Sequence, residues 1–156
     1  MWICDNDFDA WLEKLGLLHG KRTCYKCGGR TTISVKKDER YGCWRCTTRN
    51  CRARQGYLCG TFFEGTHLST KKVFHLSYLW AYRLGTYDYI EFATGINRHT
   101  IVDWKRKFRH QAGNNTGTYK SYLPEFLWRK RFGNIENVFY NFWHHVSLFY
   151  PCERNE

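Results

Sequence analysis

The sequence has no long run of apolar residues. No stretch approaches the roughly 18 apolar residues that a membrane-spanning helix requires, and residues 1–19 mix Asp5, Asp7, Asp9 and Glu13 among their apolar positions. A secretory signal would instead carry an uninterrupted apolar segment here. We therefore expect an intracellular protein, located in the nucleus if the host is eukaryotic and in the cytoplasm otherwise. The sequence also contains no internal repeat and no low-complexity tract.

Acidic residues are few relative to basic ones. The chain has 14 Asp and Glu against 25 Lys and Arg, which gives a formal net charge of +11 and a pI near 9.4. This excess favours a polyanionic partner, because Lys and Arg that contact phosphates release counterions from it. Nucleic acid is the expected partner, ahead of an anionic membrane surface. The charge is concentrated in residues 20–60, where eleven Lys or Arg oppose only Asp38 and Glu39, whereas residues 1–19 have a net charge of −3.

The length and the apolar pattern indicate a folded protein of mixed secondary structure. The 156 residues suffice for one modest domain or two small ones, and an apolar content of 42% is ordinary. Apolar residues at three- and four-residue steps predict a helix over 5–18 and several helices after Leu68. Two strand-like runs at 31–35 and 41–44 flank a polar turn at 36–40, as in a β-hairpin. The sequence thus predicts an α+β fold that is mostly α-helical.

Three of the predicted helices have the spacing of a helix-turn-helix. The first carries an apolar stripe over 73–84, the second covers 87–93, and the third covers 98–110. Gly95 lies in the tight turn between the last two, and Asn97 is the expected N-cap of the third. In such a motif the last helix lies in the major groove of DNA.

The third of these helices is rich in basic residues. We expect its N-terminal residues to reach base edges and its later Lys and Arg to contact phosphates. The alternative is an ordinary solvated basic face. Its apolar residues, Ile101, Val102, Trp104 and Phe108, are assigned to packing. The residues expected to contact DNA here are Arg98, His99, Thr100, Lys105, Arg106, Lys107 and Arg109.

The chain beyond this helix begins with a segment typical of a linker. Residues 112–121 are rich in Gly, Asn and Thr. Two further helices are predicted over 123–131 and 135–150, and the second is rich in aromatic residues. Its aromatic face must pack on the helices of residues 69–110, bind a partner, or aggregate. The first of the two carries a second basic patch, Arg129, Lys130 and Arg131, whose role is open.

The eight cysteines point to a metal site, because clustered cysteines in an intracellular protein bind metal more often than they form disulfides. Cys24 and Cys27, followed by two Gly residues, form the outline of a zinc knuckle. Across the predicted hairpin, Cys43, Cys46 and Cys51 offer two ways to complete a tetrahedral four-cysteine site. The spacing slightly favours Cys43 with Cys46, but Cys46 with Cys51 is also possible. The zinc would be structural, since a catalytic zinc keeps an open position.

The other cysteines, and the aromatic and basic residues near the predicted metal site, have different expected roles. Cys4, Cys59 and Cys152 are expected to be buried thiols and not metal ligands. Trp44 can either stack on a base or belong to the core. Lys36 and Lys37 lie at the tip of the predicted hairpin. The arginines beside the second cysteine group that are expected to contact phosphates are Arg45, Arg49, Arg52 and Arg54.

Several motifs in the first 110 residues are similar to motifs of a single protein family. They are Tyr-Gly-Cys-Trp-Arg-Cys at 41–46, Cys-Arg at 51–52, Gly-Thr-Phe-Phe-Glu-Gly-Thr-His-Leu-Ser at 60–69, Tyr-Leu-Trp-Ala at 78–81 and Thr-Ile-Val-Asp-Trp at 100–104. Together they resemble the N-terminal half of Merlin-type transposases, insertion-sequence-related enzymes of the DDE class. The resemblance extends from the first predicted helix to about His110.

This resemblance implies a zinc ribbon followed by a helix-turn-helix that binds the terminal inverted repeats of a transposable element. It also implies a ligand set of Cys24, Cys27, Cys46 and Cys51, because Cys43 matches a position that is usually not a ligand in the family. We adopt this set, with Cys43 as the alternative. Residues 122–133 are similar to the segment that closes the catalytic domain of these enzymes, and the core that precedes this segment in the family is missing here.

The acidic residues that this enzyme class requires are also missing. DNA strand transfer uses two metal ions held by convergent carboxylates, which the family would place after the helix-turn-helix. No Asp occurs beyond Asp103, and the later acidic residues are Glu125, Glu136, Glu153 and Glu156. The 44 residues after Ala112 are too few for a separate catalytic core, which needs on the order of a hundred residues. We therefore predict no catalytic residues and no transposase activity.

The sequence as a whole predicts a transposon-derived protein that binds double-stranded DNA and is not an enzyme. It can act as a homo-oligomer or with the intact transposase, and we expect no membrane partner. Two alternatives stay open: a fragment of an active transposase that performs DNA transposition when complete, and an RNA- or protein-binding zinc ribbon. The predicted division is an N-terminal helix (1–19), a zinc ribbon (20–60), a helix-turn-helix (61–111), a linker (112–121) and a C-terminal helical remnant (122–156).

Overall fold

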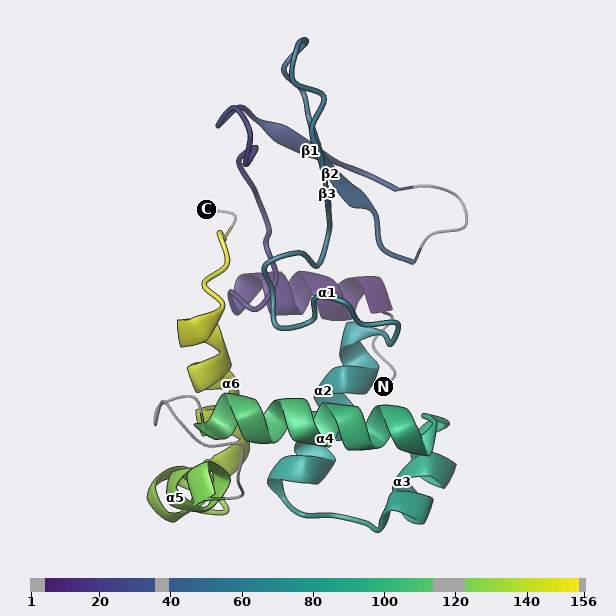
Figure 1. Cartoon of the computed structure of the whole chain (residues 1–156), viewed down its shortest axis with the longest axis vertical. Coiled ribbons are helices and arrows are strands. Elements are labelled where there is room, and N and C mark those ends of the chain that lie inside the picture. Colours follow the sequence, from purple (N-terminus) through teal and green to yellow (C-terminus); the bar gives the residue numbers. More distant parts are fainter. Residues whose placement is uncertain (1–4, 36–39, 114–122, 155–156) are drawn as a thin grey trace. The chain divides into compact units, whose positions relative to one another are not determined.

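The computed structural model describes residues 5–35, 40–113 and 123–154. Within these ranges the chain forms six helices and a three-stranded antiparallel sheet (Figure 1). This confirms the prediction of an α+β fold that is mostly helical. The contacts divide the chain into two compact units, Met1–His67 with Tyr150–Glu156, and Leu68–Phe149. No helix among the described residues is both long and apolar enough to cross a membrane.

The first unit combines one helix with the sheet. Helix α1 (Asp5–Lys14) buries Phe8 and Leu12. Strands β1 (Thr31–Ser34), β2 (Cys43–Cys46) and β3 (Arg54–Gly56) are arranged in the order β1-β2-β3. The predicted polar turn at 36–40 lies almost entirely outside the described residues, and β3 was not predicted from the sequence.

The register of the sheet separates its two faces, because successive side chains of a strand point to opposite sides. Trp44 of β2 is paired with Ile33 and Gln55 on one face. Only 4% of Trp44 is exposed, and its Nε1 donates to the carbonyl oxygen of Tyr57 at 3.3 Å. Trp44 therefore belongs to the core and offers no face for stacking on a base. The Tyr57 hydroxyl in turn donates to Glu13 Oε1 at 2.6 Å, which joins the sheet to α1.

The Gly-Thr-Phe-Phe-Glu-Gly segment after the sheet forms a tight corner. Phe62 and Phe63 are buried, and the Thr61 hydroxyl donates to the carbonyl oxygen of Leu58 at 2.7 Å. The Gly60 amide donates to Glu64 Oε2 at 3.0 Å. This motif therefore has a structural role, with its aromatic side chains in the core and its polar groups occupied locally.

The C-terminal segment of the chain returns to the first unit. The Gly20 amide donates to the carbonyl oxygen of Glu153 at 2.9 Å, and the Glu153 amide donates to His19 Nδ1 at 3.2 Å. Burial and the nearby Arg22 lower the pKa of His19, which favours the neutral imidazole that this hydrogen bond requires. The Tyr150 ring packs edge-on against Phe62, with ring centroids 5.7 Å apart.

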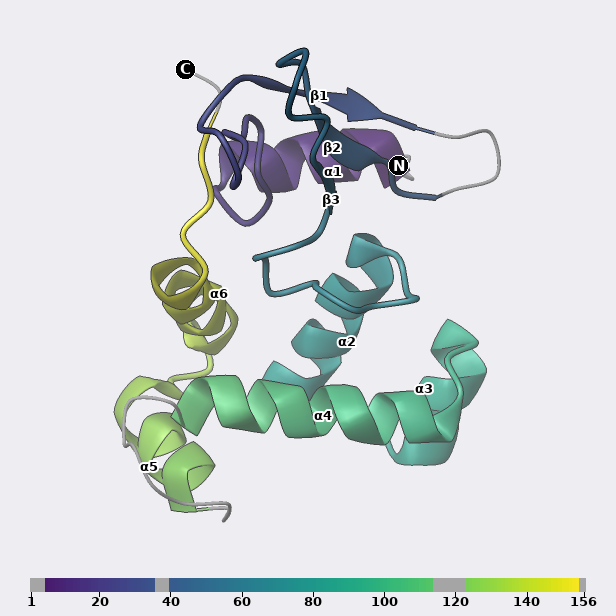
Figure 2. The ribbon, with the colours of Figure 1, turned by 45° about the horizontal axis from the view of Figure 1, so that its top comes forward.

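The second unit is entirely helical within the described residues. It consists of α2 (Thr70–Ala81), α3 (Tyr87–Thr94), α4 (Arg98–Gly113), α5 (Leu123–Phe132) and α6 (Val138–Phe149). Helix α4 crosses α2, with α3 near one end and α5 near the other (Figures 1 and 2). Residues 112 and 113 of the predicted linker complete α4, and the rest of the linker lies outside the described residues.

Aromatic residues of α6 fill the core of this unit. The Phe142 ring lies 5.1 Å from Trp80 of α2 and 5.6 Å from Phe108 of α4, centroid to centroid. Trp143 Nε1 donates to the hydroxyl of Ser77 at 3.1 Å. The aromatic face predicted over 135–150 thus packs on α2 and α4, the first of the three arrangements expected from the sequence.

Arg129 of α5 is nearly buried and caps α2. Its Nη1 and Nη2 donate to the carbonyl oxygens of Ala81 and Trp80 at 3.0 and 3.2 Å, and its Nε donates to Glu125 at 2.7 Å. The last carbonyl groups of a helix have no partner within it. Arg129 supplies a donor for the Ala81 carbonyl and shares the Trp80 carbonyl with the Arg83 amide, which donates to it at 3.2 Å. Of the basic patch considered in the sequence, only Lys130 and Arg131 are exposed.

Candidate metal centre and nucleic-acid interface

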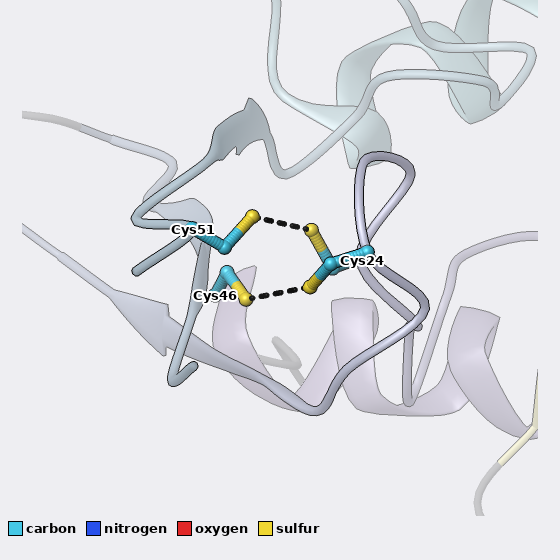
Figure 3. A group of neighbouring side chains, drawn as sticks. Cys24, Cys46 and Cys51 are labelled. Atoms are coloured by element: carbon cyan, nitrogen blue, oxygen red, sulfur yellow. Dashed lines mark hydrogen bonds between the residues drawn. The ribbon is translucent and has the colours of Figure 1, made fainter. Parts of the chain in front are cut away.

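Four cysteines of the first unit converge on one point. The sulfur atoms of Cys24, Cys27, Cys46 and Cys51 all lie within 4.8 Å of one another. Cys24 and Cys51 are 3.6 Å apart, and Cys27 and Cys46 are 3.5 Å apart, sulfur to sulfur. Figure 3 shows the labelled Cys24, Cys46 and Cys51 side chains meeting from the two sides of this site. One pair comes from the loop before β1, and the other from the end of β2 and the turn after it.

Each pair is held in a short turn whose amides face the sulfurs. The Lys26 amide donates to Cys24 Sγ, and the Thr48 amide donates to Cys46 Sγ, both at 3.4 Å. The first turn is closed by the Gly28 amide, which donates to the carbonyl oxygen of Cys24 at 2.8 Å. Gly28 has a φ of +68°, a left-handed conformation that glycine adopts without steric cost. This explains why glycine follows Cys27 in the sequence.

The geometry fits a tetrahedral metal ion. Thiolate sulfurs about 2.3 Å from a tetrahedral ion are about 3.8 Å from one another, close to the 3.5 and 3.6 Å observed. The Lys26 amide lowers the pKa of Cys24, and the Gly29 amide does the same for Cys27. The Ala53 amide lowers the pKa of Cys51, but burial and hydrogen bonds with the neighbouring sulfurs outweigh it and raise the pKa to about 12.

The raised pKa of Cys51 favours its protonated thiol when no cation is bound. A bound cation displaces the remaining protons and compensates the thiolate charge. The cluster can therefore hold a metal ion through four sulfur ligands, with no nitrogen or oxygen ligand from the described residues.

Cys43 is not part of this cluster. It precedes Cys46 by three residues on β2, so the two side chains point to opposite faces of the sheet. Cys59 accepts a hydrogen bond from Gln55 Nε2 at 3.2 Å. Burial raises the pKa of Cys152 to about 11, which keeps it a thiol. Cys4 lies outside the described residues.

Thr48 is a part of the site that was not predicted from the sequence. Its hydroxyl oxygen lies 3.7 Å from Cys27 Sγ, and a Cβ added at Gly29 would collide with this hydroxyl. Thr48 follows Cys46 by two residues, the same step that separates Lys26 from Cys24. That repeated step is the signal by which the second turn can be found in a sequence.

The four arginines near the second cysteine pair are all exposed, but they lie in two places. Arg49 and Arg52 flank Cys51, beside the sulfur cluster. Arg45 and Arg54 are directly opposite each other on β2 and β3. Lys36 and Lys37 of the predicted hairpin tip lie outside the described residues.

Helix α4 begins after a three-residue turn. Gly95 ends α3 in the left-handed conformation, with a φ of +63°, and its amide donates to the carbonyl oxygen of Glu91. Asn97 Oδ1 accepts from the His99 amide at 2.9 Å, so Asn97 caps the helix as predicted. Of the predicted packing residues, Ile101, Trp104 and Phe108 are buried, whereas Val102 is half-buried.

The polar residues of α4 fall on different sides of the helix. His99, Asp103, Arg106 and His110 are spaced by four, three and four residues, so they share one face, and all four are exposed. This is the outer face of α4. Arg106 Nη1 lies 3.4 Å from Asp103 Oδ1, a weak surface pair that leaves the guanidinium accessible.

Two other basic residues of α4 are turned toward α3. Arg98 Nη1 donates to Asp88 Oδ1 at 2.6 Å, and Lys105 Nζ lies 4.3 Å from the centre of the Tyr87 ring. Burial and the nearby Arg109 lower the pKa of Lys105. Thr100, Lys107 and Arg109 are half-buried, and Lys107 Nζ lies 4.7 Å from the Trp104 ring centre. The predicted contact residues are therefore not equivalent, and His99 and Arg106 are the two that are exposed on the outer face of α4.

Comparison of the chain with protein-family models, with curated proteins and with solved structures finds no match in any of the three. Its function is therefore inferred from the sulfur cluster, the sheet and α4.

Proposed function

We propose that this chain is a transposase-like protein that binds double-stranded DNA through a zinc ribbon and a helix-turn-helix, without cutting it. The observation that carries the proposal is the outer face of α4. His99, Arg106 and His110 are exposed on this face. The apolar side of the same helix is buried and packs on α2 and α3. The resemblance to Merlin-type transposases supplies the class of target, the terminal inverted repeats of a transposable element.

The α3–turn–α4 arrangement supports the assignment of a helix-turn-helix. Such motifs join two helices by three or four residues, often including Gly, and here residues 95–97 join α3 to α4. Ile96 in the turn is buried, as are Ile90 before it and Ile101 after it. These apolar residues hold the two helices in a fixed geometry, which a helix that reads base edges requires.

The ligand set supports zinc as the bound metal. Four thiolates in a tetrahedral arrangement are typical of structural zinc sites. All four positions are filled by cysteine sulfur, so a bound ion has no open position for a water or a substrate. The zinc would hold the two cysteine turns together and orient the exposed arginines of the ribbon.

The acidic residues of the second unit support binding without catalysis. Asp88 pairs with Arg98, Asp103 with Arg106, and Glu125 with Arg129. Glu91 accepts from the Arg98 amide at 3.1 Å. Each of these carboxylates has a partner on its own helix or a neighbouring one, and the Glu125 pair is nearly buried. The further assignments, to a nuclear or cytoplasmic location and to a homo-oligomer or a complex with intact transposase, are proposals that depend on the transposase class.

The proposal is tested by selecting duplexes from a random DNA library with the zinc-loaded full chain and measuring binding to the selected duplex and a scrambled one. Arg106→Gln should weaken binding to the selected duplex by roughly tenfold, the value of one base contact of 1–3 kcal/mol, and reduce the preference for it. Lys130→Gln, which removes an exposed cation of α5, serves as the control and should change neither. If no duplex is enriched, the proposed function is wrong.

A further inference from the structure

We propose that the face of the sheet that carries Arg45 and Arg54 is a phosphate-binding surface that grips the sugar-phosphate backbone of duplex DNA. This inference rests on the proposed function and adds a second contact, separate from α4 and from the metal ligands. We call this surface the arginine face. It is defined by Thr32, Ser34, Cys43, Arg45, Arg54 and Gly56, which the strand register places on one side of the sheet.

The two arginines form an unusual cross-strand pair. Arg45 and Arg54 are direct register partners on neighbouring antiparallel strands, so their Cβ atoms are about 5 Å apart. Like charges directly opposite each other destabilise a sheet. Both side chains are exposed, and among the described residues neither is within salt-bridge distance of an acidic group. An anion held between the two guanidinium groups removes this repulsion, and phosphate matches their fork of donors.

The rest of the arginine face suits the approach of a polymer backbone. The other members of this face, Thr32, Ser34, Cys43 and Gly56, have small side chains or none. Thr32 is the partner of Arg45 on the other side and adds a hydroxyl donor. Glu13 and Asp9 raise the pKa of Tyr57, and the Tyr57 ring stacks on Trp44 of the opposite face of the sheet.

Arg49 and Arg52 have a different environment. Four thiolates around a divalent cation leave a net charge of −2, and these two arginines flank the ligand Cys51 in the sequence. Their charge is therefore opposed locally by the metal centre when it is loaded. Arg45 and Arg54 point away from Cys46, on the side of the sheet that Cys43 occupies, and have no such counter-charge.

The experiment compares Arg45→Gln, Arg54→Gln and the double variant with the wild type. Binding of the zinc-loaded chain to the selected and the scrambled duplex is measured at several salt concentrations. Each phosphate contact contributes about 0.9 to the slope of log K against log salt, so the double variant should reduce the slope by about two on both duplexes. Preference for the selected duplex should stay unchanged, because phosphates carry no sequence information.

Two controls distinguish the loss of any positive charge from the loss of charge on the arginine face. Lys14→Gln removes an exposed cation from α1 of the same unit and should leave the slope unchanged. The pair Arg45→Lys and Arg54→Lys keeps the charge and should keep most of the slope. Retained zinc stoichiometry shows that each variant is folded. An unchanged slope in the double variant contradicts the inference but leaves the proposed function standing, whereas a wild type that binds no duplex overturns both.

Cys43 supplies an independent readout, because its half-buried thiol lies on the arginine face two residues from Arg45. Bound duplex should slow alkylation of Cys43 several-fold, measured by mass spectrometry of the Cys43 peptide. Alkylation of Cys59, outside this face, should be unaffected. Equal rates at Cys43 with and without bound duplex contradict the inference.

Discussion

Arg129 illustrates, at the residue scale, how a basic side chain can belong to the core. In sequence it is one of three consecutive cations, Arg129, Lys130 and Arg131. In the structure its side chain is 10% exposed and bridges Glu125 and the end of α2. Spacing cannot distinguish these roles, because the distinguishing contact joins residues 48 positions apart.

We therefore expect Arg129→Gln to destabilise the second unit. The substitution leaves the nearly buried Glu125 carboxylate and the Ala81 carbonyl group without their partner, and breaking such a pair costs about 3 kcal/mol. Urea denaturation followed by the helical circular dichroism signal measures the change in the free energy of unfolding. Lys130→Gln is the matched control at an exposed position and should change it by less than about 0.5 kcal/mol. Similar effects for both variants would argue against a structural role for Arg129.

Sequence spacing is also insufficient to distinguish the roles of the basic residues of α4. Their clustering in sequence predicts a charged helix, but the contacts of Arg98 with Asp88 and of Lys105 with Tyr87 come from packing against α3. Helical periodicity does place His99, Asp103, Arg106 and His110 on one face, so the outer face of α4 is predictable from the sequence. Which cations are free to reach DNA depends on the neighbouring helix.

At the scale of elements, the helices were predictable and one strand was not. The expected helix over 87–93 corresponds to α3 and the one over 98–110 to α4, because Gly95 and Asn97 mark their ends. The helix predicted over 135–150 is shorter in the structure, since α6 begins at Val138. Strand β3 comprises only Arg54, Gln55 and Gly56, which lack the apolar alternation that identifies a strand.

The cysteine site shows why local spacing and strand geometry can disagree. Cys43 and Cys46 have the three-residue spacing of a knuckle, and spacing alone favoured them. Because both lie on the extended strand β2, their sulfurs point to opposite faces. Cys51 lies in a turn after the strand and can fold back toward Cys24. The limits of β2, once known, are enough to exclude Cys43 from the set of metal ligands.

We expect metal removal to affect the two units unequally. The sheet of the first unit is three short strands held beside the sulfur cluster, and structural zinc commonly supplies the folding free energy of such ribbons. The second unit has an apolar core of its own around Phe142 and Trp80. Two-dimensional NMR of the full chain during chelation should therefore show loss of dispersed amide signals from residues 23–59, while signals from α2, α4 and α6 persist.

The control for this experiment is restoration of the lost signals by added zinc. Cys43→Ser should behave like the wild type throughout, whereas Cys46→Ser should lack the dispersed ribbon signals even with zinc present. A ribbon spectrum unchanged by chelation would contradict a structural metal at this site.

At the scale of the whole molecule, the chain passes between its two units twice. The first passage lies between His67 and Leu68, and the second between Phe149 and Tyr150. The sequence predicted a division into five consecutive segments, with residues 122–156 as a remnant at the end. In the structure residues 123–149 share a core with α2 and α4, and the last residues hydrogen-bond to Gly20 and His19. Such contacts between distant parts of the sequence leave no periodic signal.

The two units offer complementary contributions to DNA binding in this account. We propose that the first unit contacts phosphates through Arg45 and Arg54 and that α4 contacts bases through its outer face. Phosphate contacts give affinity that depends strongly on salt, and base contacts give sequence preference. We therefore expect sequence-specific binding to require both units to be folded in the same chain.

The most direct measurement of this central claim is the affinity of the zinc-loaded full chain for the selected duplex and for a scrambled duplex, followed by fluorescence anisotropy before and after addition of a zinc chelator. We expect a clear preference for the selected duplex that is lost with the metal and restored when zinc is returned. Binding that is equal for both duplexes and indifferent to chelation would contradict it.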